Sequence, residues 1–136
     1  MSDELFDVDR FDSGKVDQFI IDEIDSVPHL EALLLLWRCA PRHVSTAELA
    51  QKLYISQGRA AAVGEDLQRR GLITRDHEGA TGFFYDLHSE ERNRLLEAVD
   101  ATYRRELIRI SGIIHSKPSA GVRAFANAFR FRKDKD

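Results

Sequence analysis

The segment from Ser45 to Phe84 constrains the fold more than any other part of this chain. It begins with a capping box, in which the Ser45 hydroxyl accepts from the Glu48 amide and the Glu48 carboxylate reaches back to the Ser45 amide. The helix that starts there is interrupted at residues 54–56, where Ser56 can cap a second helix from Gln57 to Arg70. The spacing therefore predicts two helices joined by a short turn.

A β-hairpin is predicted directly after the second helix. Gly71 stands where a left-handed helix cap is favoured, and Leu72 to Leu87 alternates in polarity on both sides of a loop with two glycines. The order helix, turn, helix, hairpin is that of a winged helix-turn-helix. We therefore expect a mainly helical fold with a short hairpin wing and a C-terminal helical extension.

The apolar spacing of this segment, read as LAQKL, IS, V, L and GLI, resembles that of small bacterial regulators of the MarR and ArsR kind. The resemblance covers about a third of the chain. It implies that the second helix of the motif enters the major groove of DNA and that the wing contacts phosphate. Those roles would fall on Gln57 to Gln68 and on the loop from Arg75 to Gly82.

Six polar side chains are expected at the DNA, because base edges and phosphates are usually read by Arg, Lys, Asn, Gln and hydroxyl groups. We expect Gln57, Arg59, Gln68 and Arg69 at the groove, and Thr46 and Arg75 at phosphates. The resemblance thus implies a small transcriptional regulator that binds double-stranded DNA.

A second hypothesis stays open, because the outward face of the predicted second helix is poor in cations. It carries mainly small residues, with Gly58, Ala61 and Ala62 beside the acid Glu65, and the wing holds acids as well. Such a surface suits a winged-helix module that does not bind DNA and docks on a transcription or signalling partner instead. A continuous basic face would favour the DNA reader.

Length and composition limit the function classes. The 136 residues, 43% of them hydrophobic, suit a single folded domain, and one cysteine excludes an internal disulfide. The acidic beginning of the chain does not resemble a signal or transit peptide, and the longest apolar run, Ala32 to Trp37, is too short to cross a bilayer. We expect a cytoplasmic protein without membrane contact.

Charge is unevenly distributed and suggests three regions. The first 28 residues hold nine acids and two bases, whereas the remainder holds fourteen acids and eighteen bases. We expect an acidic flexible arm at 1–14, a winged helix-turn-helix domain at 15–88 and a helical dimerisation extension with a basic tail at 89–136. The arm is either a solvated tail or a strip that competes with nucleic acid for a basic surface.

Two helices are predicted before the capping box. Apolar residues at helical spacing predict a short helix from Val16 to Ile24, and Ser26 can cap the next one. That second helix should end at Pro41. Its buried stripe is expected to consist of Leu30, Leu33, Leu34 and Trp37.

The longest predicted helix begins at Ser89 and could run to His115. Apolar residues at steps of three and four form a seam about 27 Å long, which is long for so small a domain to cover alone. We expect this seam to join two copies into a homodimer, the alternative being packing within the chain against Leu30 to Trp37. The seam consists of Leu96, Val99, Tyr103, Leu107, Ile110 and Ile114.

A last helix is predicted after Ser119, with Val122, Phe125, Ala126 and Phe129 on one face and a basic tail behind it. Its phenylalanines alternate with arginines, a pattern that can stack on bases but more often buries an amphipathic helix.

No catalytic or metal-binding pattern is present in the sequence. Cys39 and His43 have a ligand-like spacing but lack the paired motif of a tetrahedral site, so we expect a buried helical cysteine and a surface histidine. Adjacent acids such as Glu65 and Asp66 diverge around a helix and are interpreted as solvated. We expect no enzyme activity, no cofactor and no metal.

Overall fold

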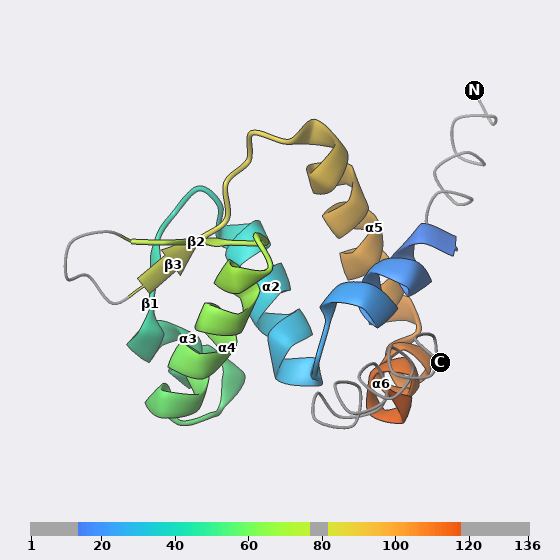
Figure 1. Ribbon diagram of the computed structural model, residues 1–136, viewed down its shortest axis with the longest axis horizontal. Coiled ribbons are helices and arrows are strands. Elements are labelled where there is room, and N and C mark those ends of the chain that lie inside the picture. Colours follow the sequence, from blue (N-terminus) through green and yellow to red (C-terminus); the bar gives the residue numbers. More distant parts are fainter. Residues whose placement is uncertain (1–13, 77–81, 118–136) are drawn as a thin grey trace, which may run out of the picture.

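A computed structural model describes residues 14–76 and 82–117 (Figure 1). The first described element is a helix over residues 14–23. It is followed by α2 (Val27–Cys39), β1 (Val44–Ser45), α3 (Thr46–Leu53), α4 (Gln57–Arg69), β2 (Thr74–Arg75), β3 (Gly82–Phe84), α5 (Glu90–Arg105) and α6 (Leu107–Ser116). The predicted fold class, a mainly helical winged helix-turn-helix with helices after the wing, is confirmed.

The strands form one small antiparallel sheet in the order β1-β3-β2. Val44 is paired with Phe83 on one side of β3, and Arg75 is paired with Phe83 on the other. The predicted hairpin is thus present as β2 and β3, although its strands are shorter than the alternation suggested. The third strand, β1, was not predicted, because two residues are too few to show a period of two.

Helix α2 lies at the centre of the core. It packs against α3, α4, α5 and β3, and its leucines at 30, 33, 34 and 36 have no exposed surface. The predicted stripe omitted Leu36 and included Trp37, which is only partly buried. The difference follows from the sequence LEALLLLW, which is apolar almost all around the helix, as expected for a helix covered on several sides.

Serine caps fix the start of four helices. The hydroxyls of Ser26, Ser45, Ser56 and Ser89 each accept a hydrogen bond from the backbone amide three residues on, as the sequence predicted. The second half of the predicted capping box is different. The Glu48 carboxylate accepts two bonds from the Arg42 guanidinium, at 3.2 and 3.0 Å, and these bonds lower the pKa of Glu48.

The single long helix predicted from Ser89 to His115 is wrong, because the chain breaks at Glu106 into α5 and α6. Glu106 has φ −129° and ψ 51°, which is outside the helical region. After the break, α6 lies beside the helix over 14–23, where the Arg109 guanidinium is 2.8 Å from the Asp17 carboxylate. The Lys117 ammonium also donates to the carbonyls of Ile20 and Ile24. These contacts hold α6 against the first helix.

Several predictions lie outside the described residues. They are most of the acidic arm, the tip of the wing at 77–81, the last helix with its phenylalanines and the basic tail. Within 14–76 and 82–117, no helix has the length and apolar character needed to cross a membrane.

Candidate nucleic-acid interface

Helices α3 and α4 form the helix-turn-helix. They are joined by residues 54–56, and the α3 end is closed by Tyr54 in the left-handed conformation, with φ 59°. Helix α4 then packs against α2 and α3 (Figure 1). As predicted, its buried face holds Ala60, Val63 and Leu67, joined by Gly64.

The opposite face of α4 is open to solvent. All four residues predicted to read base edges, Gln57, Arg59, Gln68 and Arg69, are exposed. Gly58 and Ala62 are exposed between them, so small residues make part of this face flat, beside the half-exposed acid Glu65. Thr46, predicted at phosphate, is half-buried as the first residue of α3.

Two of the predicted DNA-contacting arginines are paired with acids of α4. Arg69 forms an ion pair with Asp66, one turn earlier on the same helix. The Arg75 guanidinium of β2 lies 3.6 Å from the Glu65 carboxylate and 5.7 Å from the centre of the Phe83 ring. These pairs reduce the positive charge that the face presents to a polyanion.

Arg59 differs from these two arginines. Within the described part of the chain, no carboxylate forms an ion pair with its guanidinium. It lies in the first turn of α4, three residues after the Ser56 cap. Together with the exposed Lys52 in the last turn of α3, Arg59 places the unpaired positive charge of the motif on the two sides of its turn.

The base of the wing is tightly packed. Gly82 lies so close to the Val44 carbonyl oxygen that a Cβ atom would be 2.7 Å from it, which only glycine tolerates. The His43 imidazole contacts the Asp76 carboxylate and stacks on Phe84, with ring centres 4.3 Å apart. These contacts fix where the two wing strands leave the sheet.

The back of α4 is held by contacts that the sequence did not suggest. The buried His29 ring lies 2.8 Å from the Asp66 carboxylate through Nε2, and its Nδ1 lies 2.6 Å from the Ser26 hydroxyl. Arg70 bonds the Asp25 carboxylate at 3.0 Å. Asp66 is thus engaged in specific pairs, and its interpretation as a merely solvated acid was wrong, whereas Glu65 is 45% exposed as well as paired with Arg75.

Asp25, His29 and Asp66 could together hold a metal ion, since their ligand atoms lie within 4.8 Å of one another. Each of them already has a partner in Arg70, Ser26 or Arg69, so the fold accounts for their positions. The predicted pair Cys39 and His43 lies apart from this cluster. Cys39 is half-buried at the end of α2, and His43 is exposed in the following loop.

The seam predicted for dimerisation is mostly covered by the chain itself. Five of its six residues are 0–7% exposed, so they have almost no surface left for a second copy. This burial agrees with the alternative expectation that the seam packs within the chain. These are Leu96, Val99, Tyr103, Ile110 and Ile114. Leu107 is 51% exposed, and its neighbour Ile108 is 86% exposed.

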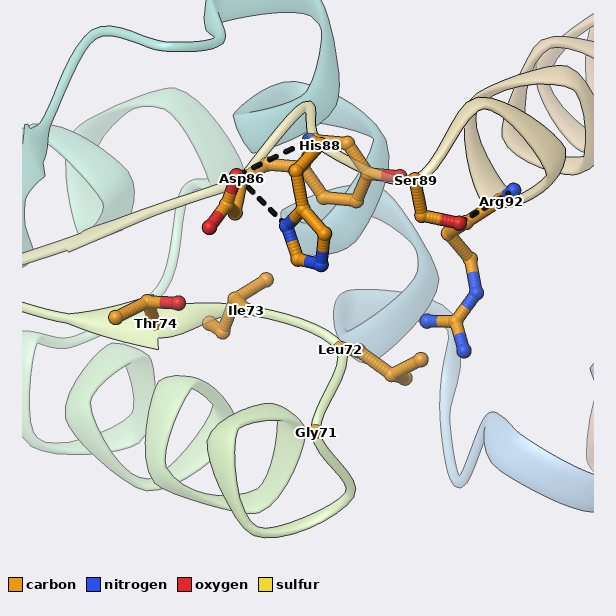
Figure 2. Close-up of a pocket in the computed structure, with 9 residues that line it drawn as sticks. Gly71, Leu72, Ile73, Thr74, Asp86, His88, Ser89 and Arg92 are labelled. Carbon is orange, nitrogen blue, oxygen red and sulfur yellow. Dashed lines mark hydrogen bonds and ion pairs between the residues drawn. The ribbon is translucent and has the colours of Figure 1, made fainter.

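A cavity of about 170 Å³ lies between the winged domain and the start of α5 (Figure 2). Its polar lining includes Asp86, His88 and Arg92. Asp86 accepts from the His88 amide at 3.1 Å and lies 2.9 Å from the His88 imidazole, and these contacts lower the pKa of Asp86. The Asp86 carboxylate and the His88 imidazole are therefore already paired with each other.

No protein-family model and no curated protein matches this sequence. Among solved structures, the fold is similar to a MarR family protein from Bacillus stearothermophilus, with 18% sequence identity and a TM-score of 0.47. The match covers 98% of this chain and 94% of that protein. It is also similar to a multiple antibiotic-resistance repressor from Listeria monocytogenes, with 14% sequence identity and a TM-score of 0.48. That match covers 97% of this chain and 88% of the repressor. The YusO protein from Bacillus subtilis has 13% sequence identity and a TM-score of 0.46, and the match covers 99% of this chain and 94% of YusO. The resemblance to MarR family structures is one of fold.

Proposed function

We propose that this chain is a cytoplasmic transcriptional regulator that binds double-stranded DNA through α4, which we term the recognition helix, and acts as a homodimer. The observation that carries the proposal is that the recognition helix is buried on one side and exposed on the other. Its inner face is locked into the core, while its first two turns expose Gln57, Arg59 and a flat surface of small residues. A helix presented in this way fits the major groove of B-DNA.

The first turn of the recognition helix has the chemistry of base readout. Gln57 can pair with adenine, and Arg59 can pair with guanine or with a flanking phosphate. The small residues Gly58 and Ala62 allow the helix backbone to approach the bases closely. Gln68 and Arg69 lie at the far end of the helix, and Arg69 is paired with Asp66, so we assign them a smaller part.

Phosphate contacts are proposed for Thr46 and Arg75. Thr46 is the first residue of α3, where helix amides favour an anion. Arg75 lies at the base of the wing and would exchange Glu65 for phosphate. Both arginine and hydroxyl contacts of this kind set the register of a protein on the duplex.

The homodimer is proposed on an exposed apolar surface formed by Leu107 and Ile108 of α6 with Ile21, which is 44% exposed. Ile21 lies one turn after Asp17, and Asp17 binds Arg109, the neighbour of Ile108. A two-fold pair would present two recognition helices to successive major grooves. We propose a DNA-binding part at 15–88, which also contributes Ile21 to the dimer surface, a dimerisation part from 89 onward and an arm at 1–14.

A second function is favoured by a different observation. Because Asp66 and Glu65 already pair with Arg69 and Arg75, the surface offers few cations to phosphate. A protein-interaction module would tolerate this arrangement, with the small outward residues of α4 packed on a transcription or signalling partner.

Binding to a random-sequence DNA duplex at about 50 mM and about 200 mM salt tests the proposal. We expect binding that weakens with salt, and stronger binding by a form lacking residues 1–14 if the acidic arm competes for the same surface. If neither form binds at the lower salt concentration, the DNA proposal fails and the protein-interaction module takes its place.

A further inference from the structure

Tyr54 stands out from the chain's other described aromatic residues by its exposure. Its side chain is 94% exposed, whereas Tyr85, Tyr103 and Phe83 are 2%, 7% and 1% exposed. A tyrosine ring left in water gains nothing for the fold, and tyrosine is enriched where a protein meets a partner.

The backbone fixes the direction in which this ring projects. Tyr54 occupies the left-handed region, which is unfavourable for a residue with a Cβ. The turn holds it there, since its amide donates to the carbonyls of Ala50 and Gln51, and the next amide, of Ile55, donates to Ala50 at 3.0 Å. Strained residues of this kind cluster at functional sites.

The charge around Tyr54 favours an anionic partner. The sixteen residues from Leu49 to Gly64 contain two bases, Lys52 and Arg59, and no acid, in a chain with 23 acids. Lys52 lies in the last turn of α3, and Arg59 lies in the first turn of the recognition helix. Tyr54 is between these two exposed cations along the chain.

We infer that Tyr54 binds the DNA backbone at the edge of the major groove, with its hydroxyl donating to a phosphate oxygen. This inference rests on the proposed function, because it places the turn beside the groove that receives the recognition helix. Tyrosine hydroxyls make such positioning contacts in protein–DNA complexes. The contact is uncharged, so it adds affinity without releasing a counterion.

Three substitutions test the inference on the full chain with a fluorescent random-sequence duplex. Tyr54→Phe removes only the hydroxyl, whereas Tyr54→Asn and Tyr54→Gly remove the ring and suit the left-handed backbone. We expect Tyr54→Phe to bind about five- to tenfold more weakly, and the other two at least as weakly. The slope of log affinity against log salt should stay at the wild-type value. Thermal unfolding should show all three folded, with Tyr54→Gly no less stable than the wild type.

Two results overturn the inference, and they differ from each other. If the wild type binds DNA and the folded Tyr54 variants bind equally well, Tyr54 does not contact the duplex, while the proposed function stands. If the wild type itself shows no salt-dependent binding, the proposed function fails, and the assignment of Tyr54 fails with it.

Discussion

The Glu65 carboxylate of the recognition helix lies 3.6 Å from the Arg75 guanidinium of the wing. Both side chains are nearly half exposed, at 45% and 43%, so water screens the pair and it stabilises the fold by only about 0–1 kcal/mol. A phosphate group can therefore displace Glu65 at little cost to stability. In the proposed complex the displaced carboxylate would still repel the DNA, so we expect this pair to affect DNA affinity more than folding.

Glu65→Gln should strengthen DNA binding, because it removes a negative charge from the groove-facing side and releases Arg75 for phosphate. We expect an affinity gain of about three- to tenfold at low salt and a salt slope steeper by about one. Titration of labelled duplex at several salt concentrations measures both. The matched control is Glu97→Gln on the exposed side of α5, which should leave both unchanged. Equal gains from the two variants would show that only net charge matters.

Arg59→Ala and Arg69→Ala should differ in their effect on DNA binding, although both remove one exposed arginine. Arg59 has no acidic partner within the described residues, so its loss should lower affinity and reduce the salt slope by about one. Arg69 is already paired with Asp66, so its loss should change the slope much less. The same salt titration compares them, and an equal loss of slope in both variants would contradict the role given to Asp66.

The parts of the fold that depend on neighbouring residues could be predicted from the sequence. The four serine caps, the left-handed Gly71 with φ 76° and the inner face of the recognition helix all follow from spacings of a few residues. In such cases the side chain and its backbone partner lie within one helical turn, so the pattern contains the whole interaction.

The missed features depend on residues far apart in the chain. His29 and Asp66 are 37 residues apart, and Glu65 meets Arg75 only because β2 returns beside α4. After the helix break at Glu106, Arg109 contacts Asp17, 92 residues away. For the candidate site, the exposed residue types could be listed from the sequence. The sequence could not show that acids neutralise two of the arginines, because ion pairs between elements depend on the tertiary arrangement.

Ile108→Asp should give monomers without unfolding the chain. Ile108 is 86% exposed, so a charge there costs the fold little, but it would be buried on the proposed dimer surface. Light scattering measures the mass, and circular dichroism shows whether the helices persist. Leu87→Asp is the control, since Leu87 is 42% exposed in the loop before α5. An Ile108→Asp protein that stays dimeric would remove α6 from the interface.

Stability should fall at alkaline pH partly through Tyr103. Burial and its hydrogen bond to Glu31, at 2.9 Å, raise the pKa of Tyr103 from its ordinary value of 10.0 to about 12. Because the folded pKa is the higher one, the stabilisation is complete below about pH 10 and is lost as pH rises through about 12. Unfolding midpoints from about pH 9 to 12 should therefore fall less in Tyr103→Phe than in the wild type. Parallel curves for the two proteins would contradict this assignment.

Gly64→Ala should destabilise the chain, because the recognition helix packs there directly on the wing. A Cβ at Gly64 would lie 2.3 Å from Cε2 of Phe83, whose ring is 1% exposed and cannot move aside freely. We expect a loss of about 1–3 kcal/mol in the free energy of unfolding. Gly112→Ala in α6 is the control, since nothing lies within 4 Å of its Cβ position, and it should gain about 0.5–1 kcal/mol. Denaturant titrations of both variants measure these changes. Equal gains would mean that Phe83 does not pack on Gly64, and the Arg75–Glu65 pair would then be left as the described side-chain contact between the wing and the helix proposed to read DNA.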